Sequence, residues 1–177
     1  MSGQPLEVVE VEQPGCFELI GLHSGATQPL AAALSASTSS PGANSPWPTK
    51  PGAVLRTADG RLEALHFAPG RWLLPDPSAE LFAAIAGQSA AVLVDVEGKW
   101  QRRSVRGSGA MRLLAAAADV EAMLAGRDCA ALSLCDCPAI VARGRGTIEL
   151  WVHASFARFL DEGLAHIRSR VASRRAP

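Results

Sequence analysis

The stretch from residue 130 to 167 constrains the fold most strongly, because it has the pattern of a β-hairpin followed by a helix. A short apolar run at 139–142 leads into Arg-Gly-Arg-Gly at 143–146, and the two glycines suit a turn that needs positive φ. The next segment, 147–152, is rich in β-branched and aromatic residues, which favour a strand. Another apolar run, 131–135, precedes the hairpin and adds a further strand.

A helix is expected directly after this hairpin. Ser155 can serve as its N-cap. Apolar residues then recur at three- and four-residue spacing, which is typical of a helix with one buried stripe. The stripe consists of Phe156, Phe159, Leu160, Leu164, Ile167 and Val171. The pattern therefore predicts a helix that lies on the hairpin, and so an α+β fold.

The same order of elements occurs twice in the chain. A predicted strand at 16–22 runs into Ser24-Gly25-Ala26, and a second predicted strand, with alternating residues at 100–107, runs into Ser108-Gly109-Ala110. An Ala-rich segment, a hairpin and an amphipathic helix follow each of them, and two such units can bury their apolar faces together. The chain is therefore predicted to be one compact domain made of two related β-α-β-β-α halves. The expected boundaries are an N-terminal extension at 1–14, a first half at 15–96, a second half at 97–171 and a basic tail at 172–177.

Local signals define the remaining elements. Asp59-Gly60 predicts a hairpin turn, and Pro77 suits the first turn of a helix that continues to Ile85. The segment 91–96 is apolar apart from Asp95, which predicts a strand buried on both faces. Ser108 is expected to cap a helix over 111–118.

Composition excludes several classes of protein. Lys plus Arg and Asp plus Glu number 17 each, so no overall charge favours nucleic acid. No segment approaches the roughly 20 apolar residues that a membrane span needs. Residues 1–12 lack the basic and apolar regions of a secretion signal, so a cytoplasmic protein is expected. Four cysteines in such a chain are expected to be free thiols, and the spacing of Cys135-Asp136-Cys137 does not suit a zinc clamp.

Several segments together resemble the gamma subunit of heterotetrameric sarcosine oxidase. The resemblance spans about 68–164 and is carried by the segments 69–74, 94–100, 105–110, 129–134, 136–143 and 148–156, whereas residues 1–65 match only in pattern. This subunit is similar in fold to the folate-binding-type N-terminal domain of the glycine-cleavage T-protein, in which two related α+β halves associate. The resemblance therefore implies the same fold here.

The resemblance also implies a role. The family's complex oxidatively demethylates an N-methyl amino acid, with FAD and FMN in the beta and alpha subunits, NAD and a tetrahydrofolate-binding domain in alpha, and zinc in delta. The expected role is thus a non-catalytic structural subunit with alpha, beta and delta partners and with no catalytic residue, cofactor or metal of its own. The alternatives are a stand-alone folate- or small-molecule-binding module of T-protein type, and a domain that dimerises through its own apolar surface.

Six residues are candidates for a functional role. Trp47, in the long loop 35–51, could anchor a partner or fold onto the core. Arg71, Trp72 and Trp151 are of the types enriched at the centre of protein interfaces, although they suit a core equally well. Asp95 and Arg106 are charged residues beside apolar strands, which predicts either a structural ion pair or a ligand site, with Asp95 able to clamp a pterin in the folate-binding alternative.

Overall fold

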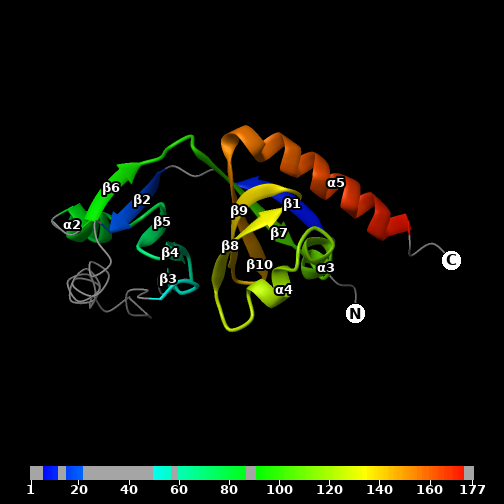
Figure 1. Ribbon diagram of the computed structural model, residues 1–177, viewed down its shortest axis with the longest axis horizontal. Coiled ribbons are helices and arrows are strands. Elements are labelled where there is room, and N and C mark those ends of the chain that lie inside the picture. The colour runs from blue at the N-terminus through cyan, green and yellow to red at the C-terminus, as the bar shows by residue number, and fades with distance from the viewer. Residues whose placement is uncertain (1–5, 12–14, 22–49, 57–59, 87–90, 174–177) are drawn as a thin grey trace. The chain divides into compact units, whose positions relative to one another are not determined.

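A computed structural model describes residues 6–11, 15–21, 50–56, 60–86 and 91–173 (Figure 1). It contains two antiparallel five-stranded sheets with a few helices, so the fold is α+β. The chain divides into two compact units. The N-terminal unit comprises Gln13–Glu97 and Asp128–Ala130, and the C-terminal unit comprises Met1–Glu12, Gly98–Arg127 and Ala131–Pro177.

The sheet of the N-terminal unit has the strand order β3-β4-β5-β2-β6. Its elements are β2 (Cys16–Gly21), β3 (Val54–Arg56), β4 (Leu62–Ala68), β5 (Arg71–Pro75), α2 (Ala79–Ala86) and β6 (Ala91–Asp95). Alternate residues of the strands face α2 and form the core with it, because successive side chains of a strand point to opposite faces. This core consists of Leu19, Leu55, Ala64, Trp72, Leu74, Leu81 and Ile85.

Strand β6 differs from its prediction. The apolar segment was expected to be buried on both faces, but β6 lies at the edge of the sheet, and Val92 and Val94 are 44% and 37% exposed. Leu93, between them, packs against the core. A largely apolar strand sequence therefore does not establish burial on both faces, since here one face of the strand is open to solvent.

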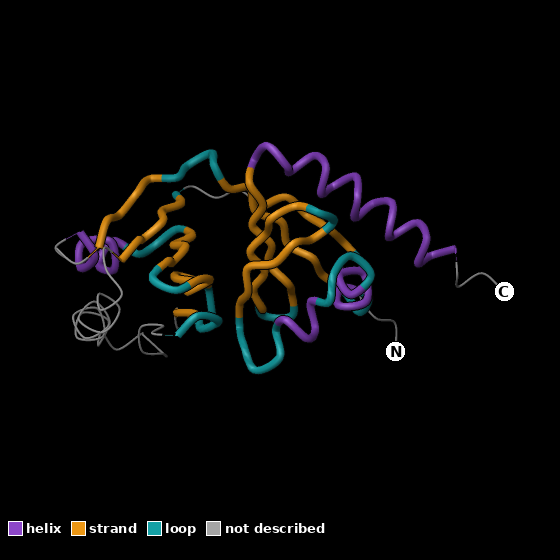
Figure 2. The backbone as a smooth tube through the Cα atoms, in the orientation of Figure 1, coloured by secondary structure: helices purple, strands orange, loops and turns teal. Residues whose placement is uncertain are grey.

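The sheet of the C-terminal unit has the strand order β1-β7-β10-β9-β8. Its strands are β1 (Glu7–Val11), β7 (Trp100–Arg106), β8 (Cys129–Leu134), β9 (Cys137–Arg143) and β10 (Thr147–His153). Its helices are α3 (Ala110–Ala115), α4 (Val120–Met123), the 3-10 turn η1 (Ala154–Phe156) and α5 (Ala157–Ser173). The tube in Figure 2 shows α5 as the longest helix, running beside these strands.

The predicted β9–β10 hairpin and the helix after it are confirmed, with Gly146 at a φ of 70° in the turn. The predicted N-cap residue, Ser155, was wrong. His153, rather than Ser155, caps η1, because its Nδ1 accepts a hydrogen bond from the Ser155 amide at 3.3 Å. Phe156 and Phe159 are 42% and 57% exposed. Leu160 and Leu164 of the predicted stripe are buried, and Ala157 is buried with them.

Helix α3 also differs from its prediction. It ends at Ala115 instead of continuing to residue 118, and Gly109 occupies the N-cap position without a side-chain hydrogen bond, so Ser108 is not the cap. The predicted helix after Ser24-Gly25-Ala26 lies outside the described residues. No helix in the described part of the chain is long and apolar enough to cross a membrane.

The two sheets have the same strand order when corresponding strands are aligned. Strands β3, β4, β5 and β2 correspond to β8, β9, β10 and β7, and the edge strand β6 corresponds to β1. Residues 7–11, which were expected to belong to an extension, thus pair with β7 in the sheet of the C-terminal unit. The strand that precedes β2 in the chain lies in the C-terminal sheet, while the strand that precedes β7, namely β6, lies in the N-terminal sheet. Each repeat therefore contributes its first strand to the sheet of the other.

Candidate functional site

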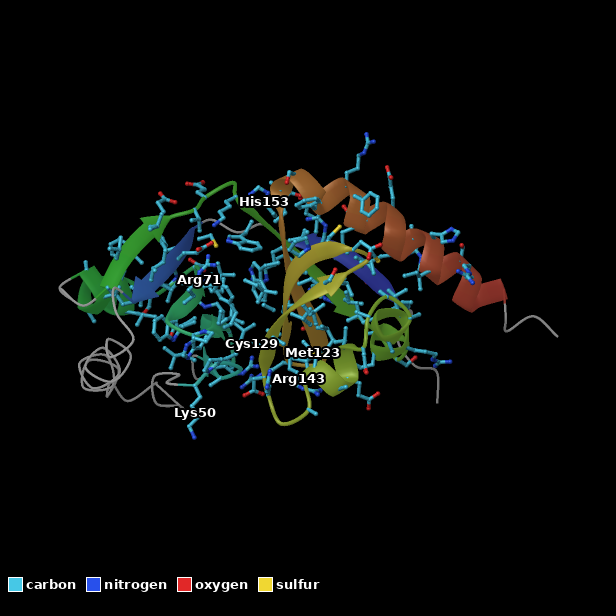
Figure 3. The ribbon with its side chains drawn as sticks, in the orientation of Figure 1. Lys50, Arg71, Met123, Cys129, Arg143 and His153 are labelled. Atoms are coloured by element: carbon cyan, nitrogen blue, oxygen red, sulfur yellow. The ribbon has the colours of Figure 1, made fainter. Side chains whose placement is uncertain are left out.

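Buried charged side chains are the chemically most unusual feature of this fold. In the N-terminal unit, Glu18 on β2 has only 3% of its side chain exposed and accepts a hydrogen bond from the Arg71 guanidinium on β5 at 2.7 Å. Alternation along the strands places this pair on the face opposite α2. Arg71, labelled in Figure 3, is 44% exposed and also lies over the Phe67 ring at 5.1 Å. Arg71 therefore neutralises the buried Glu18 carboxylate, and part of the Arg71 side chain remains accessible.

A second buried carboxylate, Glu149 on β10, lies on the corresponding face of the C-terminal sheet, opposite α5. It accepts hydrogen bonds from Thr147 Oγ1 at 2.7 Å, Ser104 Oγ at 3.0 Å and Arg102 Nε at 3.1 Å. Arg102 in turn lies 5.5 Å from the centre of the Trp151 ring. These three donors, one of which is the positively charged Arg102, satisfy the carboxylate as a buried ionised group requires.

A third charged group, Arg103 on β7, faces α5. Its Nε and Nη2 donate to the two carboxylate oxygens of Asp161 on α5 at 3.0 and 2.9 Å, and Nη2 also donates to Gln101 at 3.0 Å. Glu10 on β1 lies 3.4 Å away. The hydrogen bond that Arg103 donates to Asp161 raises the pKa of Arg103, with Coulombic attraction to Asp161 and Glu10 acting in the same direction and burial opposing them. This bidentate pair fixes α5 against the sheet.

Beside the Arg103–Asp161 pair, an open cleft of about 280 Å³ lies between β1 and α5. Its lining residues are Val8, Glu10, Arg103, Asp161, Leu164, Ala165 and Arg168. The lining combines an apolar part with charges of both signs. This composition could accept a mixed apolar and charged group.

In the N-terminal unit, His66 is fully buried and stacks on Trp72 with 4.4 Å between the ring centres. The backbone amides of Asp128 and Cys129 donate to the Gly52 carbonyl at 2.8 and 3.0 Å, and the Cys129 thiol lies 3.6 Å from the His66 carbonyl (Figure 3). Asp128 and Cys129 belong to the N-terminal unit together with Gly52 and His66, so these contacts lie within that unit. The hydrogen bonds to Gly52 hold residues 128–129 against the segment that precedes β3. The buried His66 ring belongs to the core.

The candidate partner contacts have different locations in the structure. Trp47 lies outside the described residues. Trp72 and Trp151 are both fully buried, at 0% exposed, so they are core residues and not exposed anchors. Among the three that the structure describes, Arg71 alone presents an accessible side chain, and it is engaged with Glu18.

Asp95 and Arg106 lie in different sheets. Asp95, at the end of β6, accepts a hydrogen bond from the Glu97 amide at 2.9 Å, which shapes the turn after the strand. Arg106, at the end of β7, donates to Ser104 Oγ at 3.3 Å and so joins the periphery of the Glu149 network. The structure therefore gives each of them a local role in its own unit.

Glu18, Arg103 and Glu149, the residues that carry the buried charge, are not among the six candidates from the sequence. Each is a charged residue at a strand position that faces other side chains. For Glu18 and Glu149 the signal was present, because each is a single acidic residue within an apolar strand, Cys-Phe-Glu-Leu-Ile and Ile-Glu-Leu-Trp-Val. For Arg103 the neighbouring arginines in the sequence obscured it.

The four cysteines are divided between the two units. Cys16, Cys129, Cys135 and Cys137 are thiols that form no disulfide bond. Burial raises the pKa of Cys135, with smaller contributions from Cys137 and Asp136, and burial followed by Asp136 raises the pKa of Cys137. Among the described residues, no three His, Cys, Asp or Glu side chains are grouped so as to hold a metal ion.

Comparison with known proteins gives a likeness in structure only. No family model matches the chain, and no curated protein matches it in sequence. A chain of the solved structure of heterotetrameric sarcosine oxidase from Corynebacterium sp. U-96, in complex with pyrrole 2-carboxylate, is similar with a TM-score of 0.72. The two chains are 20% identical, and the match covers 93% of this chain and 84% of that chain. The protein therefore shares its fold, over nearly its whole length, with a chain of that complex.

Proposed function

We propose that this chain is a non-catalytic, gamma-type structural subunit of a heterotetrameric sarcosine-oxidase-like flavoenzyme complex, which oxidatively demethylates an N-methyl amino acid. The likeness to a chain of heterotetrameric sarcosine oxidase carries the proposal, because it extends over 93% of this chain and includes both sheets. In this proposal the FAD, FMN, NAD, zinc and tetrahydrofolate sites belong to alpha, beta and delta partner subunits.

The buried charges support a structural role. Glu18, Glu149 and Arg103 are each bound by side chains of the same unit, at distances between 2.7 and 3.1 Å. Groups held in this way stabilise a defined arrangement of strands, since removal of one partner would leave a buried charge without its counterpart. Their role in this proposal is to keep the subunit rigid for assembly.

The direct test is isolation of the tagged chain from its native host at near-physiological salt. We expect a yellow complex that contains larger flavoprotein subunits and a small cysteine-rich subunit, identified by flavin absorbance and mass spectrometry. A colourless chain that elutes alone would contradict the proposal, and titration with tetrahydrofolate would then test the binding-module alternative.

A matched pair of variants tests the non-catalytic role. Arg71→Ala removes the exposed half of a buried pair, whereas Arg158→Ala removes an arginine that is 93% exposed. If the chain is structural, Arg71→Ala lowers the yield of assembled complex but leaves the turnover rate per flavin equal to that of the Arg158→Ala complex. A selective loss of turnover in the assembled Arg71→Ala complex would show that this chain takes part in the reaction.

A further inference from the structure

The cleft between β1 and α5 carries opposite net charges at its two ends. It lies within the C-terminal unit and has a volume of about 280 Å³. At one end, the carboxylates of Asp161 and Glu10 both approach the guanidinium of Arg103, at 2.9 and 3.4 Å. Two negative charges thus share one positive charge. One negative charge therefore remains uncompensated at this end of the cleft.

At this end, Glu10 rather than Arg103 is available to a ligand. The Arg103 guanidinium donates to both oxygens of Asp161, to the Gln101 side chain and to the Arg102 carbonyl, so most of its donors are occupied. Glu10 has 70% of its side chain exposed. Its distance of 3.4 Å from Arg103 is longer than that of a strong charge-assisted hydrogen bond, which is about 2.7–2.9 Å. The Glu10 carboxylate can therefore accept a cationic group that enters the cleft.

Arg168 forms the opposite end of the cleft. It lies two turns beyond Asp161 on α5, a separation of about 10 Å along the helix axis at a rise of about 1.5 Å per residue. Its side chain is exposed, and within the described residues no hydrogen bond or ion pair engages its guanidinium. A guanidinium can hold a carboxylate through two parallel hydrogen bonds. This end of the cleft is therefore suited to an anionic group.

The part of the cleft between the two ends is apolar. Leu164 and Ala165 lie between Asp161 and Arg168 on α5, and Val8 contributes from β1. Leu164 is buried, whereas Ala165 is exposed and Val8 is half-buried, so apolar surface is accessible to a ligand. The lining thus changes from net negative to apolar to positive along the cleft.

An ω-amino carboxylate has the complementary order of groups, namely an ammonium, a chain of methylenes and a carboxylate. A ligand of a single charge sign would leave one end of the cleft without a counterpart, and an α-amino acid carries both charges on one carbon. The volume lies near the lower limit of ligand pockets, which is about 300 Å³, and so suits a small free molecule. We propose that the β1–α5 cleft binds a small ω-amino carboxylate, with the ammonium at Glu10 and the carboxylate at Arg168.

The proposal does not depend on the proposed oxidase complex, and its test uses the purified, ¹⁵N-labelled full chain. Titration with 6-aminohexanoate, followed by NMR, should give saturable shifts of amides in β1 and in residues 161–168. Hexylamine and hexanoate each lack one of the two charged groups, and glycine lacks the chain that separates them. Each of these three compounds is expected to bind at least about threefold more weakly, because it loses an ion pair.

Two variants distinguish the ends of the cleft. Arg168→Gln should weaken binding of 6-aminohexanoate and hexanoate at least about threefold and leave the affinity for hexylamine unchanged. Glu10→Gln should have the reverse selectivity, with weaker binding of 6-aminohexanoate and hexylamine and unchanged binding of hexanoate. Arg158→Gln is the matched control, because Arg158 is 93% exposed on the same helix but outside the cleft lining. It should bind all three compounds as the original chain does, and urea unfolding verifies that each variant is folded.

Several outcomes would overturn the proposal. These are the absence of saturable shifts with the original chain, equal affinities for 6-aminohexanoate and the three comparison compounds, or equal effects of Arg168→Gln and Arg158→Gln. A peptide that ends in lysine carries the same two charged groups, and tighter binding of such a peptide than of 6-aminohexanoate would overturn the assignment to a small free molecule. The titration contains no partner subunit, so its result is separate from that of the complex isolation.

Discussion

At the scale of single residues, the Arg103–Asp161 pair is the clearest test of how charge stabilises this fold. Arg103 has 5% of its side chain exposed and Asp161 has 42%, so Asp161→Ala would leave a nearly buried guanidinium without its bidentate partner. We expect the free energy of unfolding to fall by about 2 kcal/mol, less than for a fully buried pair because water reaches Asp161. Urea unfolding measures this loss.

The matched control lies at the next position of α5. Glu162 forms an i,i+4 pair with Arg158 whose side chains are 65% and 93% exposed. Surface pairs of this type contribute about 0.3–0.5 kcal/mol, so Glu162→Ala should have a correspondingly small effect. Similar losses for the two variants would show that the Arg103 pair does not fix the helix.

The thiols of Cys135 and Cys137 give a prediction for pH dependence. Burial is the main cause that raises the pKa of each above the ordinary value of 9.0. The folded protein therefore keeps both protons at a pH where the unfolded chain has begun to lose them, so the free energy of unfolding should decline as the pH rises above about 9. Alkylation by iodoacetamide, followed by mass spectrometry, should accelerate at a higher pH in the folded protein than in urea. Coincident pH profiles would contradict the burial effect.

At the scale of elements, α5 approaches the β8–β9 turn closely at Gly163. A Cβ added there would lie 3.0 Å from both Cβ and Sγ of Cys135, a residue that has a φ of 51° in the turn. Gly163→Ala should gain about 1 kcal/mol of helix propensity but lose about 2 kcal/mol to overpacking, a net loss of about 1 kcal/mol. In a Cys135→Gly background the contact disappears, and the same substitution should stabilise by about 1 kcal/mol. A double-mutant cycle measures the difference, and additive effects would contradict it.

The elements also show how far the sequence predicted this fold. The β9–β10 hairpin and the approximate ends of strands β2, β4 and β5 could be predicted from residue alternation and from turn glycines such as Gly146. These are local signals. The exposed face of β6 and the exposure of Phe159 on α5 did not follow, because both depend on which neighbours lie across the strand or helix. Glu18 and Arg71 illustrate the same limit for the candidate site. They are 53 positions apart in the chain, and only the pairing of β2 with β5 brings them together.

At the scale of the whole molecule, the exchanged strands determine how the two repeats remain connected. Strand β1 precedes β2 in the chain but pairs with β7 over five residues, and the amides of Asp128 and Cys129 bond to Gly52. If a protease site were inserted between Glu97 and Gly98 and cleaved, residues 1–97 and 98–177 would still share these two sets of hydrogen bonds. We therefore expect the two cleaved pieces to elute together in size-exclusion chromatography without denaturant.

The contribution of the exchanged strand can be isolated by comparing the cleaved protein with a variant that lacks residues 1–11. Removal of β1 takes away a complete set of strand-pairing hydrogen bonds, each with a net value of about 1 kcal/mol, but leaves the Gly52 contacts in place. The shortened pieces should therefore separate at a clearly lower urea concentration, and β7 amides should lose protection from hydrogen exchange while β4 and β5 amides keep theirs. Separation at the same urea concentration with and without β1 would mean that the exchanged strand does not link the repeats, and the association would then depend on other contacts.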